Sequence, residues 1–292
     1  MSVNSELRLI SGPAAEPVTL LQFKEFLRIP GTDTTRDDIL QMFLVAARED
    51  CEDYCRIKLI TQTWLLRSDS FPGVSSRYDR NGFPQIALPF PPFQSIDSFQ
   101  YVDPTGAVQS LSRDTSNGSA EVGFYGYQLT PGGNVSPALL TAVWARPWPP
   151  QRLVPAATII QFRCGFGGPF TASIAQGGTQ LNSNGFVFNP DDAPGITGDT
   201  GLPISIPGAG QNGGALNTFV ASVDQNGVAT LATAATATVT NVTAWQGVPV
   251  PDKLQLSILL QAQFYNEQGA IVDMAQPRGI ESLRNHFRNL VS

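Results

Sequence analysis

One long segment of the chain carries no positive charge, and this break in composition most constrains how the chain can fold. Between Gly165 and Val248 there is no lysine or arginine, although the protein of 292 residues has 18 in all. The segment also holds 15 of the 27 glycines, four aspartates and a run rich in alanine and threonine. Because the chain exceeds the usual single-domain size, we interpret this segment as a unit inserted into a larger core.

The predicted fold class is α+β. N-terminal helices, a small and mostly antiparallel β-sheet and C-terminal helices form the core, and the inserted segment forms an all-β domain. The predicted boundaries are 1–168 for the helices and sheet of the core, 169–248 for the Gly/Thr/Ala-rich β domain, and 249–292 for the helices that complete the core.

Helical spacing marks four segments. Thr19 and Gln22 form a capping box that begins a short helix ending before Pro30. A second helix begins near Thr34 or Thr35, with a solvated acidic face at Glu49, Asp50, Glu52 and Asp53; two more begin at Pro251 and Pro277. The inner face predicted for the second helix comprises Ile39, Met42, Phe43, Ala46 and Tyr54.

Short runs rich in β-forming residues predict the strands of the core. The turn Asp103-Pro-Thr-Gly106 joins the strands 95–102 and 107–111 in a hairpin. The other predicted strands are 60–67, 85–88, 127–130, 139–144 and 157–164.

Several classes of protein are disfavoured by composition. No apolar run approaches the roughly 18 residues of a membrane span, and the start of the chain lacks a signal-peptide pattern, so we expect a soluble protein made in the cytosol. The three cysteines Cys51, Cys55 and Cys164 are too few for a disulfide framework and are expected to be buried thiols.

The glycine pattern Gly208-Ala-Gly-Gln-Asn-Gly213 matches the fingerprint of dinucleotide-binding loops. That fingerprint binds phosphate at the N-terminus of a following helix, whereas here the residues that follow predict a strand and then a turn. We therefore expect the glycines to form a β-turn, and no cofactor is predicted.

Catalytic and metal-binding patterns are equally weak. The chain has no Gly-x-Ser-x-Gly elbow and one histidine, His286, so a catalytic triad is not favoured and we do not expect an enzyme. Asp191, Asp192 and Asp199 lack the alternating spacing of a calcium loop and are interpreted as turn residues; no metal site is predicted.

An ordered series of segments resembles the head-to-tail connector (adaptor) family of tailed bacteriophages and gene-transfer particles. The series comprises Glu16-Pro-Val-Thr-Leu20, Ala46-Ala-Arg-Glu49 with Tyr54, Leu59-Ile-Thr-Gln-Thr-Trp64, Leu88-Pro-Phe-Pro-Pro-Phe-Gln-Ser-Ile96, Tyr101-Val-Asp103, Arg163-Cys-Gly-Phe-Gly167 and Val250-Pro-Asp-Lys-Leu254. The resemblance spans about residues 15–168 and 249–291. Most members lack an insertion of the present length.

The resemblance implies a structural protein without an active site. Members form a ring, usually of twelve copies, beneath the portal, where they extend the DNA channel and provide a platform for tail attachment. The implied partners are the portal protein, a tail terminator, stopper or other neck protein, other copies of the chain, and DNA that passes without sequence-specific binding. The implied location is the neck of the virion, after synthesis in the cytoplasm of the bacterial host, with no membrane contact.

The candidate residues for assembly lie at two places. In the last helix, Arg278, Arg284, Phe287 and Arg288 either dock to the portal or belong to a core helix with a solvated basic face. Trp144 and Trp148 either line a ring contact or close the β-sheet.

The insertion is similar to a small β-module of phage tail-fibre and tail-spike proteins. We expect it to project from the ring and to decorate the neck, touch capsid or fibres, or bind surface sugars. The alternative to a connector is therefore a tail or neck receptor-binding or decoration protein that acts through this module. A hydrolase that uses His286 or a carboxylate is a third hypothesis.

Overall fold

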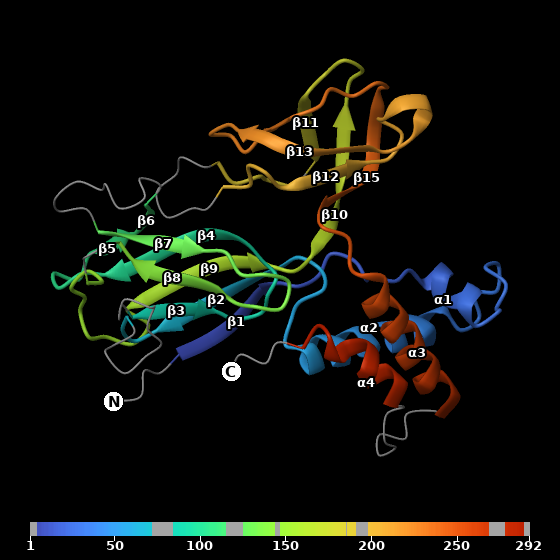
Figure 1. The fold of residues 1–292 in the computed structure, drawn as a ribbon, viewed down its shortest axis with the longest axis horizontal. Helices are drawn as coiled ribbons and strands as arrows, with labels where there is room; N and C mark the ends of the chain where they lie inside the picture. Colours follow the sequence, from blue (N-terminus) through green and yellow to red (C-terminus); the bar gives the residue numbers. More distant parts are fainter. Residues whose placement is uncertain are drawn as a thin grey trace.

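The computed structural model describes residues 5–71, 84–114, 125–143, 147–184, 186–190, 198–268 and 278–288. Within them lie helices, two β-sheets and a closed β-barrel, which confirms the α+β class. In Figure 1 the helices lie at one end of the molecule, the two sheets at the other, and the barrel stands above the line between them. No helix in the described ranges is long and apolar enough to cross a membrane.

The five-stranded sheet has the order β1-β2-β9-β4-β5, and all of its pairings are antiparallel. Strand β1 was not predicted from the sequence. The hairpin predicted around Asp103 is confirmed as β4 and β5. The strand bounds are β1 Ser5–Ser11, β2 Gln62–Ser68, β4 Phe93–Val102, β5 Val108–Ser110 and β9 Thr158–Cys164.

A second sheet, of order β3-β8-β7-β6, packs on the first, so the core has two sheets where the sequence predicted one. The buried aromatic side chains Phe99, Tyr127 and Phe162 lie between them. The strand bounds are β3 Gln85–Leu88, β6 Ser112–Arg113, β7 Gly126–Thr130 and β8 Ala138–Ala142.

The segment without lysine or arginine forms a closed six-stranded barrel of order β10-β11-β14-β13-β12-β15. Its first and last strands pair with each other from Gly167 opposite Gly247 onward, which closes the barrel and places both chain connections at one end. Alternating side chains such as Ile204, Ile206 and Val220 fill the interior. The strand bounds are β10 Gly167–Ile174, β11 Gln180–Asn184, β12 Pro203–Ile206, β13 Leu216–Val223, β14 Ala229–Leu231 and β15 Val239–Gly247.

The four described helices pack around a hydrophobic core of their own, separate from the core between the two sheets and from the core inside the barrel. The capping box predicted at Thr19 is present, with the side chains of Thr19 and Gln22 each bonded to the other's backbone. The face predicted for the second helix is wrong for Ile39, Met42 and Ala46, which are exposed. The buried row is instead Leu40, Leu44, Ala47, Arg48, Cys51, Glu52 and Cys55. The helix bounds are α1 Leu20–Phe26, α2 Asp37–Cys55, α3 Asp252–Gln268 and α4 Arg278–Asn285.

Candidate functional site

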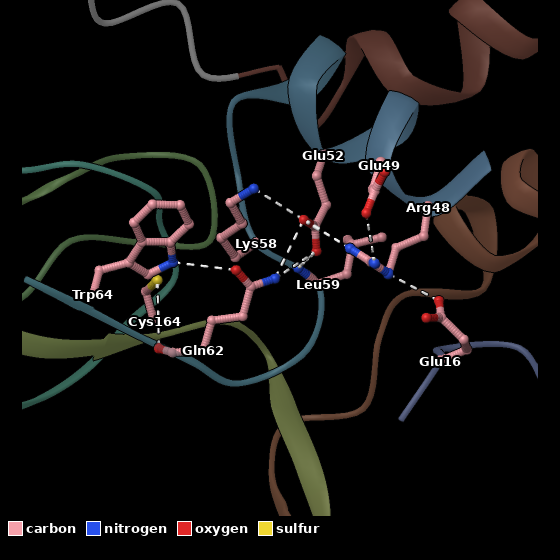
Figure 2. Close-up of polar contacts among 9 residues, drawn as sticks. All are labelled: Glu16, Arg48, Glu49, Glu52, Lys58, Leu59, Gln62, Trp64 and Cys164. Carbon is pink, nitrogen blue, oxygen red and sulfur yellow. Dashed lines mark hydrogen bonds and ion pairs between the residues drawn. The ribbon is translucent and has the colours of Figure 1, made fainter. Parts of the chain in front are cut away.

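The helices meet the sheets at a buried carboxylate near the end of α2. Glu52 is 2% exposed, although the sequence predicted a solvated position. Its carboxylate accepts hydrogen bonds from Arg48 Nη1 at 3.2 Å, Lys58 Nζ at 3.0 Å and the backbone N–H of Leu59 at 3.0 Å, as well as from Gln62 Nε2 at 3.3 Å (Figure 2). Since a buried charge is costly unless it is paired and hydrogen-bonded, Glu52 is the centre on which this joint depends.

On the helix side, Arg48 extends the network to the segment before α1. Its Nε donates to Glu16 at 2.8 Å, and its Nη2 lies 3.3 Å from the exposed Glu49. Burial raises the pKa of Glu16 above its ordinary value, and the neighbouring Arg48 offsets part of this rise. Arg48 therefore uses three of its nitrogens to tie α2 to the segment before α1 and to hold Glu52 on its own helix.

On the sheet side, Gln62 extends the network into β2. Its Oε1 accepts a hydrogen bond from Trp64 Nε1 at 3.2 Å, while its Nε2 donates to Glu52. Lys58 lies over the rings of Trp64 and Phe90, with its Nζ 5.6 and 5.0 Å from their centroids. The ammonium group of Lys58 is therefore held by the Glu52 carboxylate and also by cation–π contact with the two aromatic rings.

The backbone at this joint leaves no room for a side chain at Gly165. Its φ is +124°, and a Cβ there would lie 2.5 Å from the carbonyl oxygen of Ile60. Next to it, the hydroxyl of Thr61 accepts hydrogen bonds from Gln94 Nε2 at 2.9 Å and from Gln246 Nε2 at 2.7 Å. Thr61, in the connection from α2 to β2, therefore contacts both the five-stranded sheet, through Gln94, and the barrel strand β15, through Gln246.

A second polar joint holds the barrel connection against the five-stranded sheet. Arg163 of β9 pairs with Asp97 of β4 at 3.0 Å and with Asp199 at 3.5 Å, and its Nη2 donates to Asn189 at 3.3 Å. Asn189 in turn donates to Asp97 Oδ1 at 2.8 Å, and its N–H donates to Asp199 Oδ2 at 2.8 Å. Because Asn189 and Asp199 lie in the connection from β11 to β12, this network fixes the barrel to the sheet.

The last helix is less exposed than predicted. Arg284 is 0% exposed, and its Nη1 and Nη2 have no hydrogen-bond partner, so the prediction of a solvated or docking position is wrong for this residue. Its Nε lies 3.5 Å from Ser257 Oγ, and its carbonyl accepts from the Cys55 thiol at 3.6 Å. The reason is helical spacing: Arg284 lies four residues after the buried Ile280 and shares its inner face.

The other candidates in α4 and just after it lie differently. Arg288 is exposed and its guanidinium lies 5.2 Å from the centroid of the Tyr54 ring. Phe287 is half-buried against the helical core. Arg278 begins the helix, and its side chain is outside what the structure describes.

The thiols are buried, as predicted, and free. The neighbouring Cys55 thiol lowers the pKa of Cys51 to about 7, and the nearby Arg284 guanidinium acts in the same direction. The pKa of Cys164 is raised by its burial. Within the described ranges no group of three or more potential ligands could hold a metal ion.

Trp148 lies in the core between the two sheets. It is 7% exposed and stacks on Phe71 with ring centroids 5.0 Å apart. This position corresponds to the alternative in which the tryptophan closes the β-sheet. Trp144 lies outside the described residues.

The glycine pattern lies in the connection between β12 and β13, which is longer than the predicted β-turn and contains a short 3-10 helix at Gln211–Gly213. Gly208 and Gly213 have φ of +79° and +75°, and the strand β13 follows them instead of a helix. Asp199, considered as a calcium ligand, pairs with Arg163, while Asp191 and Asp192 lie outside the described residues.

Sequence reasoning missed both joints. One signal for Glu52 was available: Arg48, Glu52 and Cys55 continue the three- and four-residue spacing that starts at Leu40, although two of them are charged. No local signal connects Arg163 with Asn189, because the strands β10 and β11 lie between them in the sequence.

No family model and no curated protein matches the sequence. Two solved structures resemble the fold across nearly its whole length. One is from the neck of an empty gene transfer agent particle, computed with C6 symmetry (TM-score 0.50, 14% identity, 98% of this chain and 97% of that chain). The other is from the virion of a native gene transfer agent particle (TM-score 0.51, 15% identity, 98% and 96%).

The chain has the fold of a gene transfer agent neck protein. Because the similarity covers 98% of the chain, the barrel falls within it. The barrel is therefore part of this shared fold, whereas the sequence resemblance suggested an added module that most connectors lack.

Proposed function

We propose that the protein is a structural neck component of a phage or phage-like particle, a head-to-tail connector. Copies form a ring beneath the portal, extend the DNA channel and offer a platform to the tail. The role requires no catalysis, and we propose no enzymatic activity. The observation that carries the proposal is the end-to-end similarity of fold, with the barrel included, to a chain from a gene transfer agent neck. The C6 symmetry used for that neck supports a ring.

The charge of the chain suits a channel through which DNA must slide. A net charge of −6 and a barrel segment without lysine or arginine avoid the tight phosphate binding that clustered cations produce. DNA would pass along such a surface without being held. We propose that the protein is made in the cytoplasm of the host and is incorporated into the virion there.

The proposed portal contact is the outer side of α4 and the residues just after it. With Arg284 buried, the candidates whose side chains the structure describes are the exposed Arg288 and the half-buried Phe287 beside it. An aromatic ring next to an arginine is a composition enriched in protein interfaces. Arg288→Ala should weaken portal binding, while Arg113→Ala, which removes an exposed cation from the far sheet, serves as the matched control.

Co-sedimentation with the portal protein of the same particle, followed by particle imaging, tests the connector role. We expect a ring of density added to one end of the portal. A monomer that never binds the portal would overturn the proposal.

The second candidate is a receptor-binding or decoration protein that acts through the barrel. It is favoured by an open hollow of about 350 Å³ in the barrel, lined by amide side chains such as Gln180, Asn182 and Asn226. Because Pro169 lies opposite Trp245, replacing residues 170–244 by a two-residue turn would join neighbouring strands. Portal binding should survive this deletion if the protein is a connector, whereas glycan binding by the intact chain and its loss on deletion would support the second candidate.

A further inference from the structure

Among the residues that the structure describes, the five-stranded sheet has two open edges, and the longer of them is unusual. All seven residues of β1 are exposed, and the one described strand with which β1 pairs is β2. Its apolar side chains Leu7, Leu9 and Ile10 are 39%, 45% and 48% exposed. Long edge strands with exposed apolar residues are rare in monomers, because their free N–H and C=O groups recruit further strands. Strand β1 therefore has the features of a strand that pairs with a strand of another chain.

The opposite border is β5, which is also exposed over its whole length. Val108 there is 64% exposed. In Figure 1, β1 and β5 lie on opposite sides of the sheet, so one border of a copy can meet the other border of the next. Such a head-to-tail contact generates a closed ring, whereas pairing of β1 with a second β1 would generate only a two-fold dimer.

We infer that β1 of each copy pairs with β5 of its neighbour, in parallel, and that this pairing continues the sheet around the ring. The inference deepens the proposed function and rests on its ring. Its direction follows from topology: five strands that alternate in direction leave β1 and β5 running the same way. Rotation about the ring axis preserves that relation, so the junction between copies is parallel although all pairs within the sheet are antiparallel.

Side chains at the two borders complement each other in both charge and polarity. In a parallel pair the starts of both strands lie at the same end, which brings Glu6 of one copy toward Arg152 of the next. The Glu6 side chain is 65% exposed and lies 3.9 Å from Arg67 of its own chain, so a second cation can approach its carboxylate. Arg152 is exposed next to Gly106 in the turn before β5, and it makes no ion pair among the described residues. Leu7 and Leu9 face the same side as Leu66 and Trp64, so they would continue the sandwich core across the junction.

Thiol cross-linking tests the junction, because the native cysteines are buried. The double variants Arg8→Cys/Val108→Cys and Arg8→Cys/Ser110→Cys sample two registers on one face of the sheet. After assembly on the portal and treatment with a short thiol cross-linker, we expect a ladder of covalent multimers in at least one of them. Arg8→Cys/Asn217→Cys, with its second thiol on the exposed side of β13 in the barrel, should remain monomeric.

The outcomes separate the inference from the proposed function. Rings that form on the portal but yield no ladder in either register overturn the β1–β5 junction and leave the connector role intact. Dimers from Arg8→Cys alone also overturn it, since they indicate pairing of two β1 strands. If no ring forms at all, both ideas fail.

Charge reversal gives an independent test. Glu6→Arg and Arg152→Glu should each lower the yield of rings severalfold, because a like-charge contact is then repeated at every interface. The double variant should restore the yield. A double variant as defective as the single ones would contradict the pairing.

Discussion

Replacing Glu52 by glutamine tests whether this carboxylate holds the helices to the sheets. The substitution keeps the size of the side chain but removes the charge that faces Arg48 and Lys58, and it turns one acceptor into a donor. Both cations are nearly buried, with side-chain exposures of 6% and 11%. Lys58 would lose its carboxylate partner without gaining water, and Arg48 would lose Glu52 while keeping Glu16 at 2.8 Å. Breaking a buried pair in this way costs about 3–5 kcal/mol.

For a chain of this size, each kcal/mol corresponds to a change in Tm of roughly 2–4 °C, so we expect a loss of about 6–20 °C. Scanning calorimetry is the appropriate assay because the barrel has its own core and its unfolding transition should move little. The matched control is Glu49→Gln. Glu49 is 63% exposed and also contacts Arg48, at 3.3 Å, and its loss should cost less than about 1 kcal/mol. Equal, small effects of both substitutions would refute the reasoning.

Three further predictions concern single residues. Arg284→Met should leave Tm unchanged or raise it, because a buried guanidinium with two unpaired nitrogens is replaced by an apolar chain; a large loss of Tm would contradict this. Gly165→Ala should cost more than about 2 kcal/mol in urea unfolding, and Gly177→Ala, whose Cβ would meet nothing within 4 Å, clearly less. The Thr105 hydroxyl and other donors hold the pKa of Asp103 at about 2, so its stabilising effect is complete above the unfolded pKa of about 4 and is lost as the pH falls through about 2. An NMR titration midpoint for Asp103 near 4 would contradict the last prediction.

Elements whose signals are local were predictable from the sequence. The Thr19 capping box and the Asp103-Pro-Thr-Gly106 turn each act within a few residues, and both appear at the predicted positions. The strand bounds at 85–88 were also correct. Such features depend on backbone preferences and short-range hydrogen bonds, which a single sequence reveals directly.

Features decided by distant contacts were not predictable in the same way. Ile39 and Met42 have helical spacing and apolar side chains, but no other described element packs over them, so they remain exposed. Arg284 looked like a surface cation and is buried, because α4 presents that side to α2 and α3. In both cases the burial of the side chain depends on which other helices pack against it, and the residue spacing within one helix does not reveal this.

The barrel shows why the joints matter for a platform. If it were attached only through Gly167 and Gly247, the two strands at its base would form a pivot. The hydrogen bond from Gln246 to Thr61, just before β2, and the network around Arg163 of β9 add two further points of attachment to the body. Buried polar networks often contribute little to stability, but each misaligned state leaves charges unpaired, so we expect this one to select a single barrel orientation. Arg163→Met should therefore widen the range of barrel orientations in particle images, and it should also lower Tm, because Asp97 and Asp199 are nearly buried and lose this cation. A barrel as well aligned as in the unmodified protein would show that the strands at its base suffice.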